Sequence, residues 1–513
     1  MSATEERAQA RPLAVPSEPA VPPVRWGPLL ALAAGVGVLL LLLSGRYGHD
    51  GDEMYFVIAG GHPSWGYVDQ SALVPLLAKG IDLLFPGNLL ALRTPSALVT
   101  AVGVVLAALI ARELGGRPRA QLLAAAAFGT APFVLWTGHL LATTTFDTTL
   151  WAAITYLVTK WVRTRQDRLL LAAGLCTAVA LQIKYLVPIL WVAIGVAALC
   201  TGRGDLLRRP LLWVGAAITV VTALPGLLWQ NANGWPYVAM LDAVSAEQDS
   251  FQGGRVGFSA WLALYIGPLG LVLMVLGIRK LLRTPPYRFL GIALPMLFVL
   301  MLVFNGRPYY LVGLFPLGFA AGVVALQDRG PAWWRRPWAF GLTGALGVIA
   351  LVCLLPVVPQ GIAERHPALV PNPLLRGQVG WPAFTEDIGD VYRSLPPAQR
   401  AHTVVMADVY PHAAALAYEG PAHGLPPVYS GHRGFWFFGA PPDDATTAII
   451  VGGDPDFLRA HFRSVRAVGR ADDHSTLENV VLRSPTVWLV SDPVRPWSKT
   501  WPEWLHMNID DDQ

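Results

Sequence analysis

Three acidic residues, Asp50, Asp52 and Glu53, lie in the stretch GHDGDEMYF, directly after a long apolar run. The following residues predict a short helix on which Asp52 shares a face with Tyr55 and Phe56, because residues three and four apart are helix neighbours. Glu53 points about 100° away, so only one of these two carboxylates can squarely face a common cavity. Two interpretations of Asp52 remain open: a helix N-cap, or a general base that takes a proton from a hydroxyl group.

Four further charged residues interrupt or flank apolar segments. Asp147, in TTTFDTTLW, is predicted to face a cavity, a cation or a metal ion, because a carboxylate inside a membrane is costly, unless it still reaches water from the helix end. Lys184 stands at a break in an apolar run and either binds a phosphate or extends its amine to the interface. Arg93 and Arg307 stand at the ends of apolar segments, where Arg either binds phosphate or anchors a helix.

The composition is that of a membrane protein with many spans. The chain of 513 residues is 54% hydrophobic and 14% charged, whereas soluble domains carry about 25% charged residues. The net charge of +4 is modest, and we expect the lipid bilayer, and no nucleic acid, as a partner. The three cysteines lie in apolar segments and fit neither a disulfide framework nor a zinc site.

We predict eleven membrane-spanning segments. They cover residues 26–44, 88–111, 120–137, 141–162, 169–183, 185–201, 210–229, 258–278, 289–304, 309–326 and 338–356. One set of connecting loops carries seventeen Lys and Arg residues and the alternate set carries five. Because basic loops stay in the cytoplasm, the N-terminus is predicted to be cytoplasmic and the loop 45–87, with its acidic residues, to lie outside.

The predicted organisation has three parts. Residues 1–25 form a disordered cytoplasmic tail, residues 26–358 a transmembrane bundle, and residues 359–513 an extracytoplasmic α/β domain. Within the bundle, residues 169–200 form two short helices that reverse near Lys184. The domain is predicted from strands at 402–407, 446–452 and 486–490 that alternate with helices at 411–419 and 455–462.

Six segments, spread in order over residues 45–326, resemble the lipid-dependent GT-C glycosyltransferases, in the branch of the protein O-mannosyltransferases and the lipid A aminoarabinose transferase. They are DEMYF, GYVDQSALVPLL, LRTPSALVTAVGVVLAALIARELGG, FDTTLW, ALQIKYLVP and RPYYLVGLFPLG. The resemblance implies a polytopic α-helical GT-C bundle. It also implies an inverting transfer of a sugar, commonly mannose, from a polyprenyl phosphate to a hydroxyl of an extracytoplasmic protein, cell-wall glycan or secreted natural product.

The resemblance also implies roles for individual residues. Asp52 would be the base, and Glu53 would help to shape the site. The donor phosphate would be bound by Lys184, Arg93, Arg307 and Gln70. Sugar and acceptor contacts would come from Tyr55, Asp69, Asp147 and Tyr310. Asp147 is also the candidate ligand of a divalent cation, Mg or Mn.

Two departures from the family pattern bear on this assignment. Ser71 and Ala72 replace the usual Pro-Pro pair, and Gln70 stands where the aminoarabinose branch has a phosphate-binding Lys. The second departure argues against an aminoarabinose-type site and moves the phosphate role to the other cations. The aromatic segment YSGHRGFWFFG, residues 429–439, either overhangs the site or packs on the bundle.

Two rival functions remain. In the first, the chain is a transporter or flippase of a lipid-linked or anionic substrate, and its charges line a path. Transporters usually contain repeats with paired broken helices, whereas this chain has one broken segment and no internal repeat. In the second, the chain is a non-catalytic assembly or sensor protein, whose function would survive the loss of Asp52.

Overall fold

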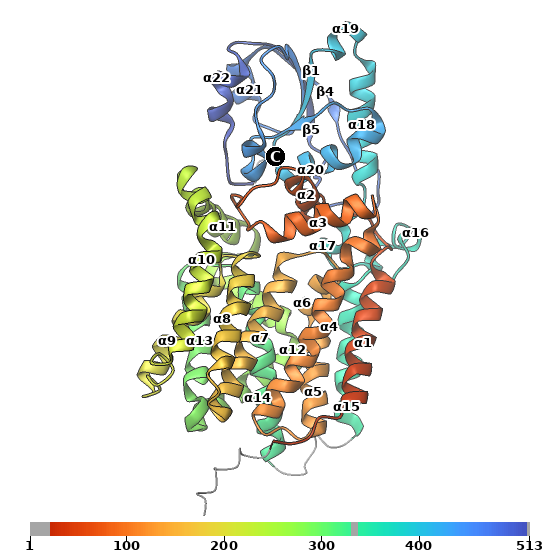
Figure 1. The fold of residues 1–513 in the computed structure, drawn as a ribbon. Helices are drawn as coiled ribbons and strands as arrows, with labels where there is room; N and C mark the ends of the chain where they lie inside the picture. Colours follow the sequence, from red (N-terminus) through yellow and green to blue (C-terminus); the bar gives the residue numbers. More distant parts are fainter. Residues whose placement is uncertain (1–20, 330–336, 510–513) are drawn as a thin grey trace, which may run out of the picture.

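The computed structural model describes residues 21–329 and 337–509, and it has a helical bundle with an α/β domain at one end (Figure 1). Residues 1–20 of the predicted tail, and Arg335 and Arg336 among the predicted cytoplasmic cations, lie outside the described residues. The bundle helices are α1 (Trp26–Leu43), α4 (Leu89–Glu113), α5 (Pro118–Gly129), α6 (Pro132–Gly138), α7 (Thr143–Thr164), α8 (Arg168–Leu181), α9 (Val187–Cys200), α10 (Pro210–Ala232), α12 (Gly254–Arg283), α13 (Arg288–Val303), α14 (Phe315–Asp328) and α15 (Pro337–Leu354).

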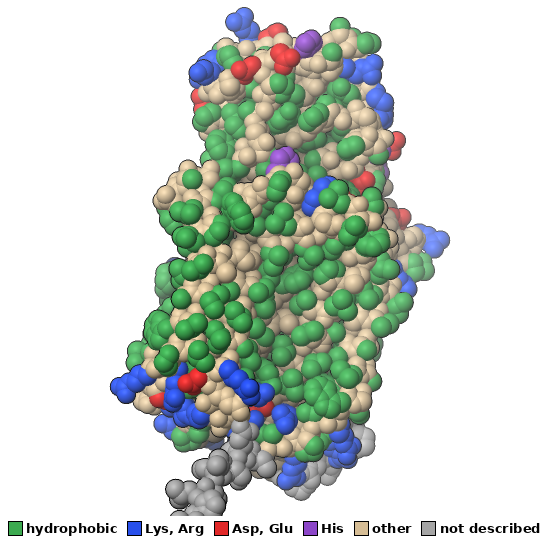
Figure 2. All heavy atoms as spheres, viewed as in Figure 1, with side chains coloured by type: hydrophobic (Ala, Val, Ile, Leu, Met, Phe, Trp, Pro, Cys, Tyr) green, Lys and Arg blue, Asp and Glu red, His purple; other side chains and the backbone are tan. Residues whose placement is uncertain are grey.

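The bundle has the surface of a membrane protein. In the described parts of the chain, six helices are long and apolar enough to cross a membrane, and the bent pair α5 and α6 would make a seventh span. Side chains on the bundle are mainly hydrophobic, and Lys and Arg gather at the end opposite the α/β domain (Figure 2). Each of the eleven segments predicted to span is helical, so this is a multi-pass membrane protein, while the count of eleven crossings stays a prediction.

Two breaks shape the interior of the bundle. Helices α8 and α9 are each 14 residues long and meet at residues 182–186, where the sequence predicts a reversal near Lys184. Helix α12 is kinked at Gly267, whose φ of 73° favours glycine, and Pro268 follows directly. Helix α14 begins after the 3-10 turn η2 (Pro308–Leu314), which carries Tyr309 and Tyr310.

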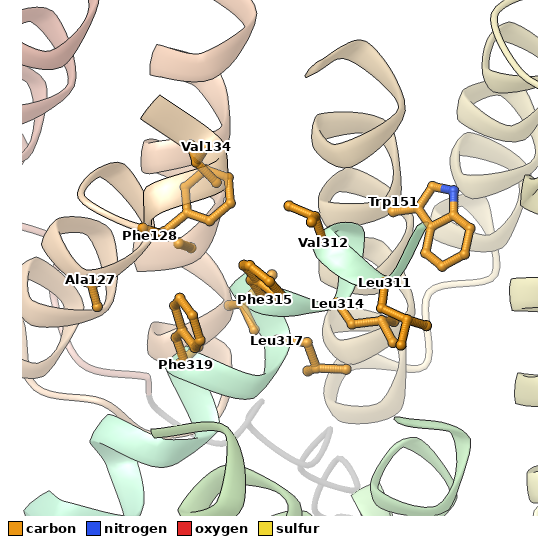
Figure 3. Packing of buried hydrophobic residues seen from close by; sticks show 14 of the residues in the cluster. Ala127, Phe128, Val134, Trp151, Leu311, Val312, Leu314, Phe315, Leu317 and Phe319 are labelled. Carbon is orange, nitrogen blue, oxygen red and sulfur yellow. The ribbon is translucent and has the colours of Figure 1, made fainter. Parts of the chain in front are cut away.

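The core of the bundle is built by aromatic and small residues. Figure 3 shows Phe315 and Phe319 of α14 facing the side chains of Phe128 and Val134, with Trp151 of α7 beside the η2 turn. The Phe315 and Phe319 rings stack with their centroids 5.3 Å apart. All these side chains are buried, and this packing gives η2 a rigid base.

Three further helices lie at the end of the bundle that carries the α/β domain. They are α2 (Gly51–Gly60), α3 (Leu73–Leu84) and α11 (Pro236–Gln252). Figure 1 shows α2 and α3 between the bundle and the α/β domain. Helix α2 packs against α3 and against α20 (Tyr410–Glu419), a helix of the α/β domain, so the acidic loop is enclosed from two sides.

The α/β domain contains one five-stranded sheet with strand order β2-β1-β3-β5-β4. The strands are β1 (Thr403–Ala407), β2 (Val428–Tyr429), β3 (Thr447–Val451), β4 (Phe462–Arg470) and β5 (Thr486–Pro493). Strand β1 pairs in parallel with β2 and β3, whereas β5 is antiparallel to β3 and β4. The three predicted strands are present, whereas β2, too short for a pattern, and β4, largely exposed, were not predicted.

Helices cover both faces of this sheet. The domain helices are α16 (Gln360–Ala363), α17 (Pro373–Arg376), α18 (Trp381–Ser394), α19 (Pro397–Arg400), α20 (Tyr410–Glu419), α21 (Pro455–His461) and α22 (Trp497–Thr500). Helix α20 packs with Val405 and Ile449 on one face, and α21 packs with Met406 and Ile450 on the other. Successive strand residues point to opposite faces, which explains this division.

Candidate active site

A polar cavity of about 210 Å³ lies where α2, the bundle and the α/β domain meet. Seven of the residues that the sequence assigns to the site line it. They are Asp52, Tyr55, Asp69, Gln70, Lys184, Arg307 and Tyr310. Asp52 and Tyr310, which are 258 residues apart in sequence, therefore converge on one cavity, which holds carboxylates, cations and phenols together.

Helix α2 aims Asp52 into this cavity. The N-cap is Asp50, whose side chain accepts the Asp52 N–H at 3.0 Å, while Glu53 Oε2 accepts the Asp50 N–H at 2.9 Å. The interpretation of Asp52 as the cap is thus wrong, because the helix begins two residues earlier, at Gly51, and Asp50 completes a capping box. The Asp52 side chain is left exposed to the cavity, beside Tyr55 and Phe56 of the same helix face.

Each of the two cavity carboxylates accepts a hydrogen bond from a tyrosine. The Tyr410 hydroxyl donates to Asp52 Oδ1 at 2.7 Å, and the Tyr55 hydroxyl donates to Asp69 Oδ1 at 3.1 Å. Burial raises the pKa of Asp69 to about 6, although Arg433 and the bond from Tyr55 oppose this. Near neutral pH Tyr55 can thus hold an ionised Asp69 carboxylate in a fixed orientation, and Tyr410 orients the side chain of Asp52.

Cations also line the cavity. The Lys184 amine lies 4.9 Å from the centre of the Tyr309 ring and 4.4 Å from that of Tyr310, and 3.5 Å from Thr144 Oγ1. Aromatic faces attract an ammonium group, so η2 holds this amine in place at the α8–α9 break. No carboxylate among the described residues forms an ion pair with Lys184, although the buried Asp147 carboxylate is near enough to interact with its charge.

Two arginines share one carboxylate at the rim of the cavity. Arg307, before η2, and Arg433, in the α/β domain, both donate to Glu247 of α11, one to each carboxylate oxygen. Arg433 also lies 5.2 Å from the centre of the Tyr410 ring. Two positive charges against one negative charge leave this rim cationic.

Glu53 and Arg93 lie behind the cavity and not in its lining. Arg93 Nε and Nη2 donate to the two Glu53 oxygens at 2.8 and 2.7 Å, and both side chains are fully buried. Burial opposes ionisation of Glu53, but the Arg93 guanidinium outweighs it and holds the pKa of Glu53 below its ordinary value. Glu53 Oε1 also accepts the Leu141 N–H at 2.8 Å, so this pair joins α2, α4 and the start of α7.

Asp147 is also buried and does not line the cavity. Its Oδ1 has no hydrogen-bond partner in the described part of the chain. Within those same residues, no group of three or more His, Cys, Asp or Glu side chains could hold a metal ion. The side chains present therefore do not fit the expected Mg or Mn, and we derive no step through a divalent cation.

Three site residues were not predicted from the sequence. Tyr410 and Arg433 come from the α/β domain, and Glu247 comes from an amphipathic helix without a motif. The sequence offered one sign of such a residue. Segment 429–439 was expected either to overhang the site or to pack on the bundle, and Arg433 of this segment lines the cavity. Close packing holds it there: a Cβ at Gly434 would lie 1.9 Å from the Tyr55 hydroxyl, so glycine alone fits.

Comparison with known proteins agrees with this architecture. Residues 69–229 match the family model described as dolichyl-phosphate-mannose-protein mannosyltransferase. The crystal structure of ArnT from Cupriavidus metallidurans bound to undecaprenyl phosphate superimposes with a TM-score of 0.57 and 16% identity, over 91% of this chain and 98% of that chain. The chain has the GT-C fold. None of the curated protein sequences matches it.

A second solved structure shares the GT-C fold over a similar stretch. Arabinofuranosyltransferase AftD from Mycobacteria gives a TM-score of 0.50 and 14% identity over 92% of this chain. This chain spans 42% of the length of AftD. The match to ArnT includes the α/β domain as well as the bundle, since it covers nearly all of both chains.

Proposed function

We propose that the chain transfers a sugar, mannose in the first instance, from a polyprenyl phosphate to a hydroxyl group of an acceptor outside the cytoplasm. The observation that carries this proposal is the composition of the cavity. Asp52 and Asp69 line the same cavity as Lys184, Arg307 and Arg433. An anionic donor and a deprotonatable acceptor require these two kinds of group together.

Each group has a role in an inverting displacement. Asp52, oriented by Tyr410, takes the proton from the acceptor hydroxyl as the new glycosidic bond forms. The bond between the sugar and the phosphate oxygen breaks, and the phosphate leaves with the electron pair. The three cations stabilise the charge of the leaving phosphate. Asp69 and Tyr310 contact sugar hydroxyls, and Gln70 offers its amide at the same wall.

An apolar cavity beside the site supports a lipid-linked donor. It measures about 560 Å³ and is lined by α6, the kinked part of α12 and the end of α15. Its wall includes Phe133, which stacks on Tyr309 at 5.4 Å between ring centroids, and Tyr309 lines the polar cavity. A polyprenyl chain in the apolar cavity would thus end near Lys184. The undecaprenyl phosphate bound to ArnT agrees with this class of donor.

We propose that the protein lies in the plasma membrane, with the cationic end of its bundle facing the cytoplasm. Basic loops favour the cytoplasmic side, and they lie opposite the α/β domain (Figure 2). The catalytic cavity and the α/β domain then face outward. A lipid-linked sugar is the donor suited to this side, because its tail stays in the membrane.

The test is turnover of labelled polyprenyl-phosphate mannose by wild type and Asp52→Asn, with extracytoplasmic extract as the acceptor source. We expect label in protein, glycan or small molecule from wild type. Asp52→Asn should be at least about 100-fold slower, since general-base catalysis contributes 10²–10⁴-fold. Asp50→Asn is the matched control, because Asn preserves the N-cap, and it should keep wild-type turnover.

Equal turnover by wild type and Asp52→Asn would contradict the assignment of the base. A transporter would instead move the intact donor across a vesicle membrane and leave its glycosidic bond unbroken. If no label moves from mannose, the same assay with other polyprenyl-linked sugars separates a different donor from the transport function.

A further inference from the structure

A third cavity, of about 250 Å³, lies wholly within the α/β domain. It is found at the carboxyl ends of the parallel strands β1 and β3, and its lining includes Asp408 after β1 and Gly453 and Asp454 after β3. The chain leaves β1 for helix α20 on one face and leaves β3 for helix α21 on the other. Neighbouring parallel strands whose connections diverge in this way open a crevice that typically binds ligands.

The remaining lining residues come from the C-terminal segment. Trp504 is 9% exposed, and its indole Nε1 has no hydrogen-bond partner in residues 21–329 and 337–509. His506 Nε2 lies 3.9 Å from Asp408 Oδ1, within ion-pair distance, in the same lining. Buried polar atoms are normally paired. The unpartnered indole N–H of Trp504 thus indicates that a ligand completes this crevice.

The chemistry of the lining narrows the class of ligand. The carboxylates of Asp408 and Asp454 disfavour an anion, whereas Glu503 is already paired with Arg495 and His461. Among the described residues, no group of three or more His, Cys, Asp or Glu side chains could hold a metal ion. Carboxylates accept strong hydrogen bonds from hydroxyl groups. The rings of Phe457 and Trp504 offer apolar faces. This combination matches a neutral ligand that has several hydroxyl groups and an apolar ring face. A sugar is such a ligand.

This crevice is a near neighbour of the candidate active site. Asp408 and Gly431 line the crevice, whereas Tyr410 and Arg433, two residues further along each segment, line the catalytic cavity. The intervening residues, Val409 and His432, are extended and buried. Extended residues advance about 3.3 Å each, so the two cavities are separated by roughly 7 Å along both segments.

We propose that this crevice binds a sugar residue of the acceptor, next to the hydroxyl that Asp52 activates. The identity of the ligand as an acceptor rests on the proposed function, but its binding requires no donor. A carbohydrate chain that occupies both cavities would be held at two points. Acceptors without a second sugar would use the catalytic cavity alone.

The test is direct binding of methyl glycosides and disaccharides of mannose, arabinose, galactose and glucose to the full chain in phospholipid nanodiscs, followed by saturation-transfer NMR. Nanodiscs are needed because alkyl maltoside detergents carry a sugar themselves. We expect at least one disaccharide to bind. His506→Ala and Asp454→Asn, the second of which preserves the cap of α21, should weaken binding at least tenfold.

A control variant makes the outcome decisive. His474→Ala alters an exposed histidine that is not in the lining and should bind as wild type. The crevice site would be overturned if no probe binds, or if wild type, His506→Ala and Asp454→Asn bind equally. Neither result would bear on donor turnover, which is a separate measurement. Sugar binding without any donor turnover would instead count against the proposed function alone.

Discussion

At the scale of single residues, helical spacing predicts which side chains of the acidic loop share a cavity. Asp52, Tyr55 and Phe56 lie on one face of α2, and Glu53 lies on another. What spacing could not provide is the partner of each carboxylate. Tyr410 is 358 residues from Asp52 in sequence, and no local pattern links the two.

The pH dependence of transfer should report on Asp69. Because burial raises the pKa of Asp69 to about 6, its carboxylate becomes protonated as pH falls through that value. If sugar binding needs the carboxylate, the rate should fall about tenfold per pH unit below 6. Tyr55→Phe removes a hydrogen bond that lowers this pKa and should move the inflection to higher pH.

Rates of wild type, Tyr55→Phe and Asp69→Asn between pH 4.5 and pH 8 check this, with tryptophan fluorescence as the control for folding. Asp69→Asn should lose the inflection. An inflection that stays in place in Tyr55→Phe would assign the titration to another group.

At the scale of elements, the sequence predicts the helices of the bundle and three strands of the sheet, because their apolar patterns are long and regular. It does not predict how the acidic loop is held. Arg93 was expected to bind phosphate, since an arginine at a helix end offers no sign of its partner. The structure pairs it with Glu53, which ties α2 to α4, and its role in binding donor phosphate stays a prediction.

Breaking this pair should destabilise the protein and leave donor binding largely unchanged. Arg93→Met leaves the Glu53 carboxylate buried and unpaired, which should cost about 3–5 kcal/mol. Arg93→Met with Glu53→Gln should recover part of this loss, because no unpaired charge remains.

Thermal unfolding of wild type, the two single variants and the double variant gives the coupling energy, and donor KM is measured on the folded fraction. A large rise of donor KM in Arg93→Met with an unchanged melting temperature would restore the predicted phosphate role.

At the scale of the whole molecule, the site is shared by three parts of the chain, the loop of α2, the bundle and the α/β domain. The resemblance covers residues 45–326 and could therefore predict only the first two. Glu247 holds Arg307 of the bundle and Arg433 of the α/β domain together. It also offsets part of the positive charge that a phosphate would meet.

Glu247 should therefore set how readily the lipid phosphate leaves. Glu247→Gln keeps acceptor oxygen for one arginine and removes the negative charge, so the cavity becomes more cationic. Coulomb attraction at an effective dielectric constant near 20 amounts to about 4 kcal/mol at 4 Å, so loss of one charge should tighten phosphate binding by at least tenfold. We expect a lower donor KM, stronger inhibition by polyprenyl phosphate and a lower kcat, because release of that product becomes slow.

Asp242→Asn is the matched control, since it removes the same charge from an exposed position on α11. It should leave all three kinetic constants within about twofold of wild type. Inhibition by added polyprenyl phosphate is the decisive measurement, because it needs no knowledge of the acceptor. Unchanged inhibition in Glu247→Gln would mean that Arg307 and Arg433 link the bundle to the α/β domain and do not bind phosphate. Lys184 would then be the cation that holds the donor.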